Sequence, residues 1–230
     1  MPAINAQMLT DVARQRFQAL QLPAGADRNR FQTYISDMCN AILQALQQWR
    51  TSARLEGVRI NGPVAIGGKL VADRLEPLIL ARAPAGWDAY TRAVAAGVHN
   101  QLSQFANEVS VPGLPWYPAF AAWPGPVAPP TPNVPTPLMA LSAVACRNMK
   151  EGALTSAIFD KMPNPKPPCG KEVAIALAAG LEKALLAWLS AQKVMMVMGK
   201  GRVPTFAPPY VPVGPVVMGD NISTPGHIGS

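Results

Sequence analysis

The sequence contains few charged residues. Asp, Glu, Lys and Arg make up 14% of its 230 residues, against roughly 25% in a typical soluble domain, whereas 49% of the residues are hydrophobic. Such a chain has few polar side chains with which to cover a free surface. The net charge of +7 is scattered along the sequence, and no block of consecutive basic residues indicates a nucleic-acid-binding tail. We therefore expect an obligate component of an assembly, with DNA contact through the basic surface as a minor alternative.

Residues that perform catalysis or bind metals are also scarce. The two histidines, His99 and His227, and the three cysteines, Cys39, Cys146 and Cys169, lack the spacing of a zinc site. No nucleophile elbow, phosphate-binding loop or acidic calcium loop is present. The odd cysteine count indicates reduced thiols, with Cys169 as the most exposed of them. We expect no enzyme, no cofactor and no metal; a hydrolase that uses Cys169 or His99 is the weakest alternative.

Long uninterrupted apolar runs are missing as well. The most apolar stretch, residues 173–198, contains Glu182, Lys183, Gln192 and Lys193, so its clean runs are shorter than the roughly 20 residues that cross a bilayer. The first residues do not show the basic and then apolar order of a secretory signal. We therefore expect no membrane span and no signal peptide.

Proline and glycine, by contrast, are abundant, with 25 and 18 residues, and they outline an internal repeat. Gly-Pro-Val occurs three times, and a Leu-x-x-aromatic pair precedes each copy. The turn residues of the three copies are Gly62, Pro63, Gly125, Pro126, Gly214 and Pro215. The aromatic members of the pairs, which we expect in the core of each repeat, are Trp49, Phe105 and Trp188. Pro-Ala-Gly-x-Asp stands further upstream at residues 23–27 and 84–88, and a proline-rich loop at 163–170 replaces it in the third copy.

These markers predict a mainly α fold with Pro/Gly-rich extended arms. It consists of three tandem helix–loop–helix–arm repeats with short β segments, at residues 1–68, 69–137 and 138–230. Apolar residues recur at steps of three and four over 34–49, 94–105 and 173–188, which indicates a helix in each unit. Asp27 is a candidate N-cap, and the third helix is expected to continue towards Met195. Pro77 should kink or end its helix.

The arms, at residues 111–137 and 199–230, are expected to be extended. The first arm holds ten prolines, which lack an amide donor, so it cannot form a central strand and should adopt polyproline II or irregular structure. Gly67-Gly68-Lys69 and Gly199-Lys200-Gly201-Arg202 are expected to be turns. Aromatic side chains interleave with the prolines, and we expect them to anchor the arms at interfaces. The predicted interface anchors are Trp116, Tyr117, Phe120, Trp123, Phe206 and Tyr210.

The units with their arms resemble small structural proteins of tailed bacteriophages. The residues behind this resemblance are the Gly-Pro-Val-x-x-Gly patterns, Gly62 to Gly67 and Gly214 to Gly219, and the closing Gly-His-Ile-Gly. The resemblance implies a virion component that is assembled in the host bacterial cytoplasm and has no enzymatic activity. Its partners would be copies of itself and other virion proteins, in a head-decoration, neck or tail/baseplate position.

The sequence therefore predicts a non-enzymatic structural protein that joins neighbouring subunits through its Pro-rich arms. Burial of one large aromatic side chain removes about 150–250 Å² from water, so a few anchors in each arm could hold such a joint. An alternative of another class is a peripheral binding module. It would dock a basic, Met-rich helix around Met195 to Met198 on a membrane or on an acidic partner.

Overall fold

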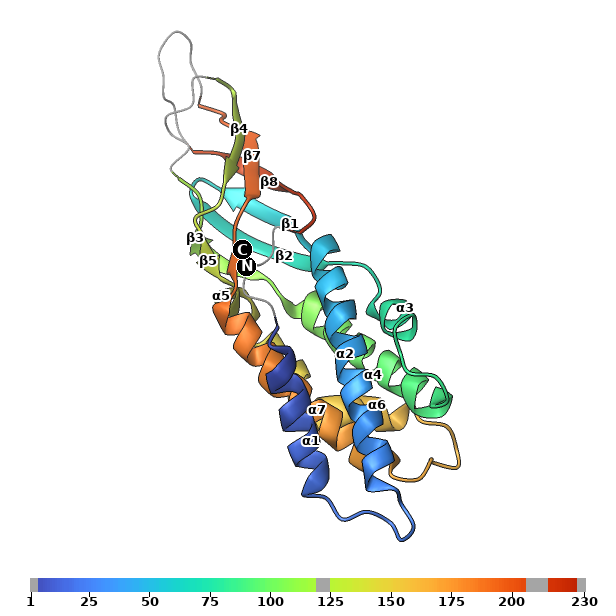
Figure 1. Ribbon diagram of the computed structural model, residues 1–230. Helices are drawn as coiled ribbons and strands as arrows, with labels where there is room; N and C mark the ends of the chain where they lie inside the picture. Colours follow the sequence, from blue (N-terminus) through green and yellow to red (C-terminus); the bar gives the residue numbers. More distant parts are fainter. Residues whose placement is uncertain (1–3, 119–124, 206–214, 227–230) are drawn as a thin grey trace.

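The computed structural model describes residues 4–118, 125–205 and 215–226 (Figure 1). The chain has a mixed α/β fold in which helices make up 51% and strands 21%. A six-stranded antiparallel sheet stands at one end of an elongated body of helices. The prediction of a mainly α fold is therefore wrong, because segments that were expected to be extended arms pair with one another as strands.

Most of the helical body comes from the predicted stripes. The helices are α1 (Ala6–Gln18), α2 (Arg28–Ser52), α3 (Leu75–Leu80), α4 (Asp88–Glu108), α5 (Leu138–Ser142), a 3-10 turn at Ala145–Met149, α6 (Glu151–Asp160) and α7 (Gly170–Ala191). Asp27 is the N-cap of α2, as predicted, because its carboxylate accepts the Arg30 amide at 3.0 Å. Pro77 lies in the first turn of α3, where no amide donor is needed, so it does not break the helix.

Helix α7 is the most deeply buried of the long helices. It packs against α1 and α6 and is apolar on nearly all sides. By length and composition α7 could cross a membrane, but 67% of that segment is buried inside the protein, as is usual for the core helix of a soluble fold. The helix ends at Ala191, earlier than predicted, and a short strand, β6 (Lys193–Val194), follows.

Two glycines allow helices to approach closely. A Cβ atom on Gly180 of α7 would lie 2.5 Å from the Leu9 carbonyl oxygen of α1. A Cβ atom on Gly97 of α4 would lie 2.6 Å from the Ile158 Cα atom of α6. Both distances are shorter than any real contact, so these two helix crossings require glycine, which has no side chain, at Gly180 and Gly97.

The large sheet has the strand order β3-β2-β1-β8-β7-β4. Its strands are β1 (Arg54–Asn61), β2 (Val64–Val71), β3 (Val111–Pro115), β4 (Val127–Pro132), β7 (Val197–Arg202) and β8 (Val217–Ser223). A separate pair joins β5 (Thr136–Pro137) to β6. Strands from all three predicted repeat units thus form one sheet, and the buried side chains form one continuous core. The predicted boundary between residues 68 and 69 falls within β2.

Glycine-rich stretches that were predicted to be turns are strands in the structure. Gly67-Gly68-Lys69 belongs to β2, and Gly199 to Arg202 belong to β7. A Cβ atom on Gly199 would lie 2.5 Å from the Tyr117 ring, and one on Gly201 would lie 2.5 Å from Val216. The glycines of β7 therefore provide room for neighbouring side chains, and close approach of this kind is one reason for glycine in a strand.

The proline-rich segment 111–137 supplies both edges of the sheet. Its strands β3 and β4 stand at the two ends of the strand order. The expectation that this segment cannot form a central strand is confirmed, although it does form strands. Each proline removes one amide donor from its edge strand, which makes growth of the sheet by strand addition less favourable.

Candidate functional site

The three Leu-x-x-aromatic pairs meet in the core. Trp49, Phe105 and Trp188 are all buried, and together with their leucine partners they line one small internal space beside the sheet. The leucine partners are Leu46, Leu102 and Leu185. The sequence markers thus lie on α2, α4 and α7 at the ends nearest to the sheet, where the three helices converge on a common apolar centre.

The Gly-Pro-Val copies precede strands. Gly62, with φ of 58°, and Pro63 form the turn between β1 and β2. The Gly62 amide donates to the Val216 carbonyl at 2.7 Å, so the first and third copies touch. Gly125 and Pro126 lead into β4, and Pro215 lies just before β8. Gly214 falls outside the described residues.

Two of the predicted interface anchors lie inside this chain. Trp116 is 1% exposed, and its indole N–H donates to the Thr136 hydroxyl at 2.6 Å. Tyr117 is also buried, and burial raises the pKa of its phenol. The backbone amides of both residues donate to the Pro63 carbonyl, at 2.7 and 2.9 Å. These two aromatics therefore fasten segment 111–137 to the chain's own sheet. Phe120, Trp123, Phe206 and Tyr210 lie outside the described residues.

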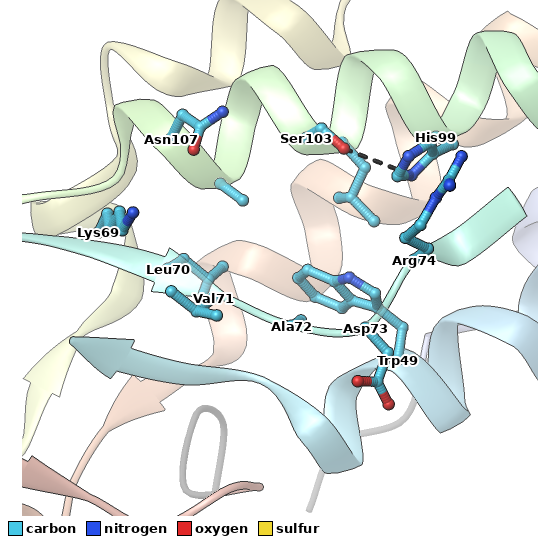
Figure 2. A pocket seen from close by; sticks show the side chains of 12 residues that line it. Trp49, Lys69, Leu70, Val71, Ala72, Asp73, Arg74, His99, Ser103 and Asn107 are labelled. Carbon is cyan, nitrogen blue, oxygen red and sulfur yellow. Dashed lines mark hydrogen bonds between the residues drawn. The ribbon is translucent and has the colours of Figure 1, made fainter.

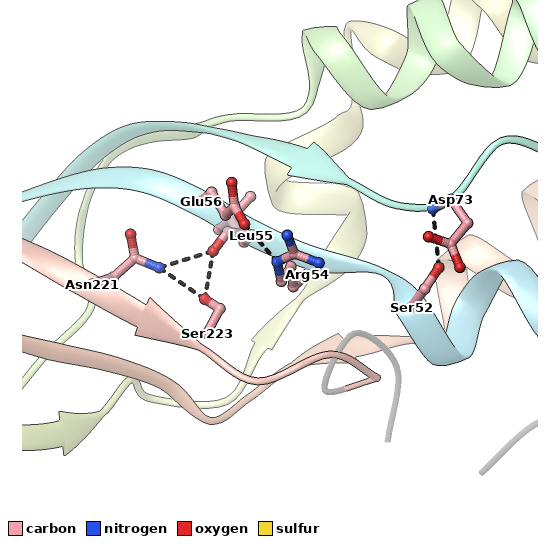
Figure 3. A network of polar contacts seen from close by, with 7 residues as sticks. All are labelled: Ser52, Arg54, Leu55, Glu56, Asp73, Asn221 and Ser223. Carbon is pink, nitrogen blue, oxygen red and sulfur yellow. Dashed lines mark hydrogen bonds and ion pairs between the residues drawn. The ribbon is translucent and has the colours of Figure 1, made fainter.

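Asparagine side chains replace missing ladder hydrogen bonds in the sheet (Figure 3). Next to the Gly57 irregularity of β1, the Asn221 amide group donates to the Leu55 carbonyl at 2.8 Å and accepts from the Val58 amide at 2.9 Å. The Ser223 hydroxyl also donates to the Leu55 carbonyl. This polar network is structural, because all its partners belong to the β1–β8 joint.

A polar cleft of about 280 Å³ lies between the end of α2, the β2–α3 connection and α4 (Figure 2). Lys69, Arg74 and His99 are among its lining residues, and the Ser103 hydroxyl lies 3.3 Å from Nδ1 of His99. Partial burial lowers the pKa of His99, and the nearby Arg74 guanidinium lowers it further against a smaller opposing effect of Glu76. No carboxylate in the described part of the chain hydrogen-bonds the other ring nitrogen. The Ser103–His99 pair therefore lacks the third group that orients a catalytic histidine.

All three cysteines are buried in the structure. Cys169, which was expected to be exposed, is 3% exposed and lies at the start of α7 with φ of 54°. Burial raises the pKa of the Cys39 thiol to about 12 and also raises the pKa values of Cys146 and Cys169. A raised pKa disfavours the thiolate, which is the nucleophilic form of cysteine.

The sheet presents an apolar outer face. Ile60 pairs with Ala65 and with Gly219, and all three are buried, so the residues next to them point to the opposite side. On that side Ile66 is 54% exposed and Ile222 is 47% exposed. We use the name outer face for the exposed apolar residues Val64, Ile66, Met218 and Ile222.

A second concave surface lies at the end of the helical body that is farthest from the sheet. This distal groove of about 460 Å³ is lined by Pro23, Ala24, Arg30, Trp87, Tyr90 and Pro168, among others. Both Pro-Ala-Gly-x-Asp loops and the proline-rich loop 163–170 contribute to it. From the sequence these markers indicated only repeat boundaries, whereas in the structure they lie together on one surface.

Comparison with family models, with curated proteins and with solved structures found no match. Within residues 4–118, 125–205 and 215–226 there is no group of three or more His, Cys, Asp or Glu side chains that could hold a metal ion.

Proposed function

We propose that this chain is a non-enzymatic structural component of a bacteriophage particle, in a head-decoration, neck or tail/baseplate position. It is assembled in the host cytoplasm, and it contacts copies of itself and other virion proteins. The resemblance to phage structural proteins motivates the class of particle. The surface of the sheet supports the role in assembly.

The observation behind the proposal is the exposed outer face between proline-rich edges. Among the described residues, eight of the eleven large exposed hydrophobic side chains lie in or beside the strands: Val64, Ile66, Val127, Val134, Met196, Val217, Met218 and Ile222. Clustered exposed apolar residues are typical of a surface that another subunit covers. Since prolines in both edge strands disfavour strand addition, a neighbour is expected to pack on the face of the sheet instead.

Charged side chains of the same strands border the outer face, and several of them are paired. Lys200 and Asp220 form an ion pair at 3.1 Å between β7 and β8, Arg54 forms one with Glu56 on β1, and Lys69 of β2 lies opposite Glu56 in register. An apolar patch with a charged border matches the anatomy of subunit interfaces, which have an apolar core and a polar rim. The low charge content of the whole chain is consistent with a protein whose surface is covered by other subunits.

The alternative of a peripheral binding module depends on a helix around Met195 to Met198, which the structure does not form. The Met-rich stretch is not helical, because α7 ends at Ala191 and Met196 has φ of 58° between β6 and β7. No basic, Met-rich helix is therefore formed in this region for a membrane or an acidic partner to bind.

Particle composition tests the proposal. Gradient-purified phage particles from a host that produces the chain should contain it at a fixed ratio to the major particle proteins, as measured by mass spectrometry. The double variant Ile66→Asp/Ile222→Asp should be incorporated less, whereas Val144→Asp should be incorporated normally, since Val144 is 68% exposed but lies away from the sheet. A chain that remains in the soluble fraction, free of particles, would contradict the proposal.

A further inference from the structure

We infer that the distal groove binds the prolines of segment 203–216 of a neighbouring copy, which links the chains head to tail. The end residues of the segment, Val203 and Val216, stay buried in their own chain. This inference rests on the proposed assembly function and specifies one of its contacts.

The groove has an aromatic wall. Trp87 and Tyr90 meet edge to face with ring centroids 5.3 Å apart, and Phe31 lies 5.1 Å from Trp87. Tyr34 stacks behind Trp87 at 4.5 Å, and the Arg30 guanidinium lies 5.0 Å from the centre of the Trp87 ring. Surfaces of packed aromatic rings recognise proline side chains in polyproline II segments.

A hydrogen-bond donor is available in that wall. The indole N–H of Trp87 makes no hydrogen bond within the described residues, and Trp87 is half-buried. Polyproline II exposes its carbonyl groups because it has no internal hydrogen bonds. An indole N–H beside stacked rings is therefore suited to donate a hydrogen bond to a carbonyl of such a segment and to set the direction of the segment.

The groove is held in shape before any ligand arrives. Arg28 donates to the carbonyls of Phe17, Gln18 and Leu20, which fixes the loop after α1. The Tyr90 hydroxyl donates to the Pro168 carbonyl at 2.6 Å, which fixes the third loop. A preformed groove loses little conformational entropy when it binds.

The chain supplies a ligand of matching chemistry. Segment 203–216 contains five prolines and no charged residue, and Pro209-Tyr210-Val211-Pro212 has the Pro-x-x-Pro spacing. The prolines of the other arm, 111–137, are largely engaged in β3, β4 and β5. Segment 203–216 is therefore the better candidate.

The segment cannot reach the groove of its own chain. Arg30, at the start of α2, lines the groove, and the 25-residue helix carries the chain about 37 Å from there to the sheet. Arg202 pairs with Val217, so the 14 residues between them leave the sheet and return to it at the same place. Such a loop can reach at most about 25 Å from the sheet. Figure 1 shows β7 and β8 at one end of the molecule and the α1–α2 loop at the other. Only a second copy can connect the two, and such head-to-tail contacts build rings or filaments.

Peptide binding tests the inference. A fluorescein-labelled peptide of residues 203–216 is titrated with the full chain, and its anisotropy is measured. We expect saturable binding that weakens at least tenfold when Pro208, Pro209 and Pro212 of the peptide are replaced by alanine. Ala24→Glu, in the groove, should also weaken binding at least tenfold. Ala85→Glu is the matched control, because Ala85 is the equivalent exposed residue of the second loop but does not line the groove.

Both variants should unfold at the wild-type temperature by circular dichroism, since both alanines are exposed loop residues. Absence of saturable binding, or equal binding by wild type and Ala24→Glu, would overturn the inference. The proposed function is separable from it by particle composition. If the peptide fails to bind while the chain is still incorporated into particles, the inference alone fails; if the peptide binds and incorporation fails, the proposed function alone fails.

Discussion

Three asparagine side chains form hydrogen bonds to the backbone where the strands of the sheet are irregular. Asn61 accepts the amide of Met218, a residue with φ of 49°, at 2.9 Å. Asn133 and Asn221 each donate to a backbone carbonyl and accept from a backbone amide of a neighbouring segment, and Asn133 also donates to the Val134 carbonyl. A side-chain amide carries the same donor and acceptor as a peptide group, so it can take the place of a ladder partner where the backbone bends away.

Asn133 provides the sharpest test of this role. Its side chain accepts from the Val197 amide at 3.0 Å and donates to the Val194 carbonyl at 3.1 Å, both in buried surroundings. We expect Asn133→Ala to lower the free energy of unfolding by about 3 kcal/mol, because two buried backbone groups lose their partner. Urea unfolding measures the change. Asn107→Ala, at an exposed residue, is the control and should change it by less than about 0.5 kcal/mol; equal effects would refute the role of Asn133.

Glu182 makes stability depend on acid pH. Partial burial acts to raise the pKa of Glu182, but the hydrogen bond from the Glu151 amide at 2.6 Å and the contact with Lys150 outweigh it, so the pKa lies below its ordinary value. A carboxylate with a lowered pKa contributes stability above the pKa of the unfolded chain, about 4.3, and loses that contribution as the pH falls through the folded pKa.

The expected result is a fall in the free energy of unfolding below about pH 4.3 that is smaller in Glu182→Gln than in wild type. Urea titrations at several pH values measure it, with Glu172→Gln on the same helix as the control. An unchanged acid slope in Glu182→Gln would show that this contact does not contribute.

At the scale of elements, helix packing depends on Gly97. We expect Gly97→Ala to destabilise the chain by about 1–3 kcal/mol, because the new methyl group would meet the Ile158 backbone of α6. Gly152→Ala is the matched control, since nothing lies within 4 Å of its Cβ position and alanine favours helix over glycine by up to about 1 kcal/mol. Thermal unfolding should therefore separate the two variants in opposite directions, and similar melting temperatures would contradict the close α4–α6 contact.

The long helices could be predicted from the sequence, whereas the sheet could not. Apolar spacing located α2, α4 and α7, and the cap at Asp27 was found because its chemistry is local. The strands β7 and β8 are rich in glycine and irregular, so they show little strand propensity. Their stability comes from contacts distant in sequence, such as Asn221 with Leu55 and Gly199 beneath Tyr117. No local pattern reports those contacts.

The candidate surfaces were only partly predictable for the same reason. The aromatic residues around proline were expected at interfaces, but Trp116 and Tyr117 are buried against the chain's own sheet. The Pro-Ala-Gly-x-Asp loops were recognised, yet their meeting at the distal groove depends on how Phe31 and Tyr34 of α2 pack against Trp87 at the start of α4. The sequence markers identified the loops and the aromatic residues, but only the fold determines which of them face solvent.

At the scale of the whole molecule, the chain has two surfaces at separate places. The apolar outer face belongs to the sheet, and the distal groove lies at the far end of the helical body. An elongated subunit with contact surfaces at both ends is suited to repeated addition in an assembly. We therefore expect the chain to associate with itself or its neighbours through these surfaces.

Size-exclusion chromatography with light scattering tests this claim most directly. We expect the wild-type chain to show a mean mass above its 24.4 kDa monomer mass that rises with concentration. At equal concentration Ile66→Asp/Ile222→Asp should show a lower mean mass, and Val144→Asp should match wild type. A wild-type mass of 24.4 kDa throughout the micromolar range, or a double variant that associates as strongly as wild type, would contradict the account.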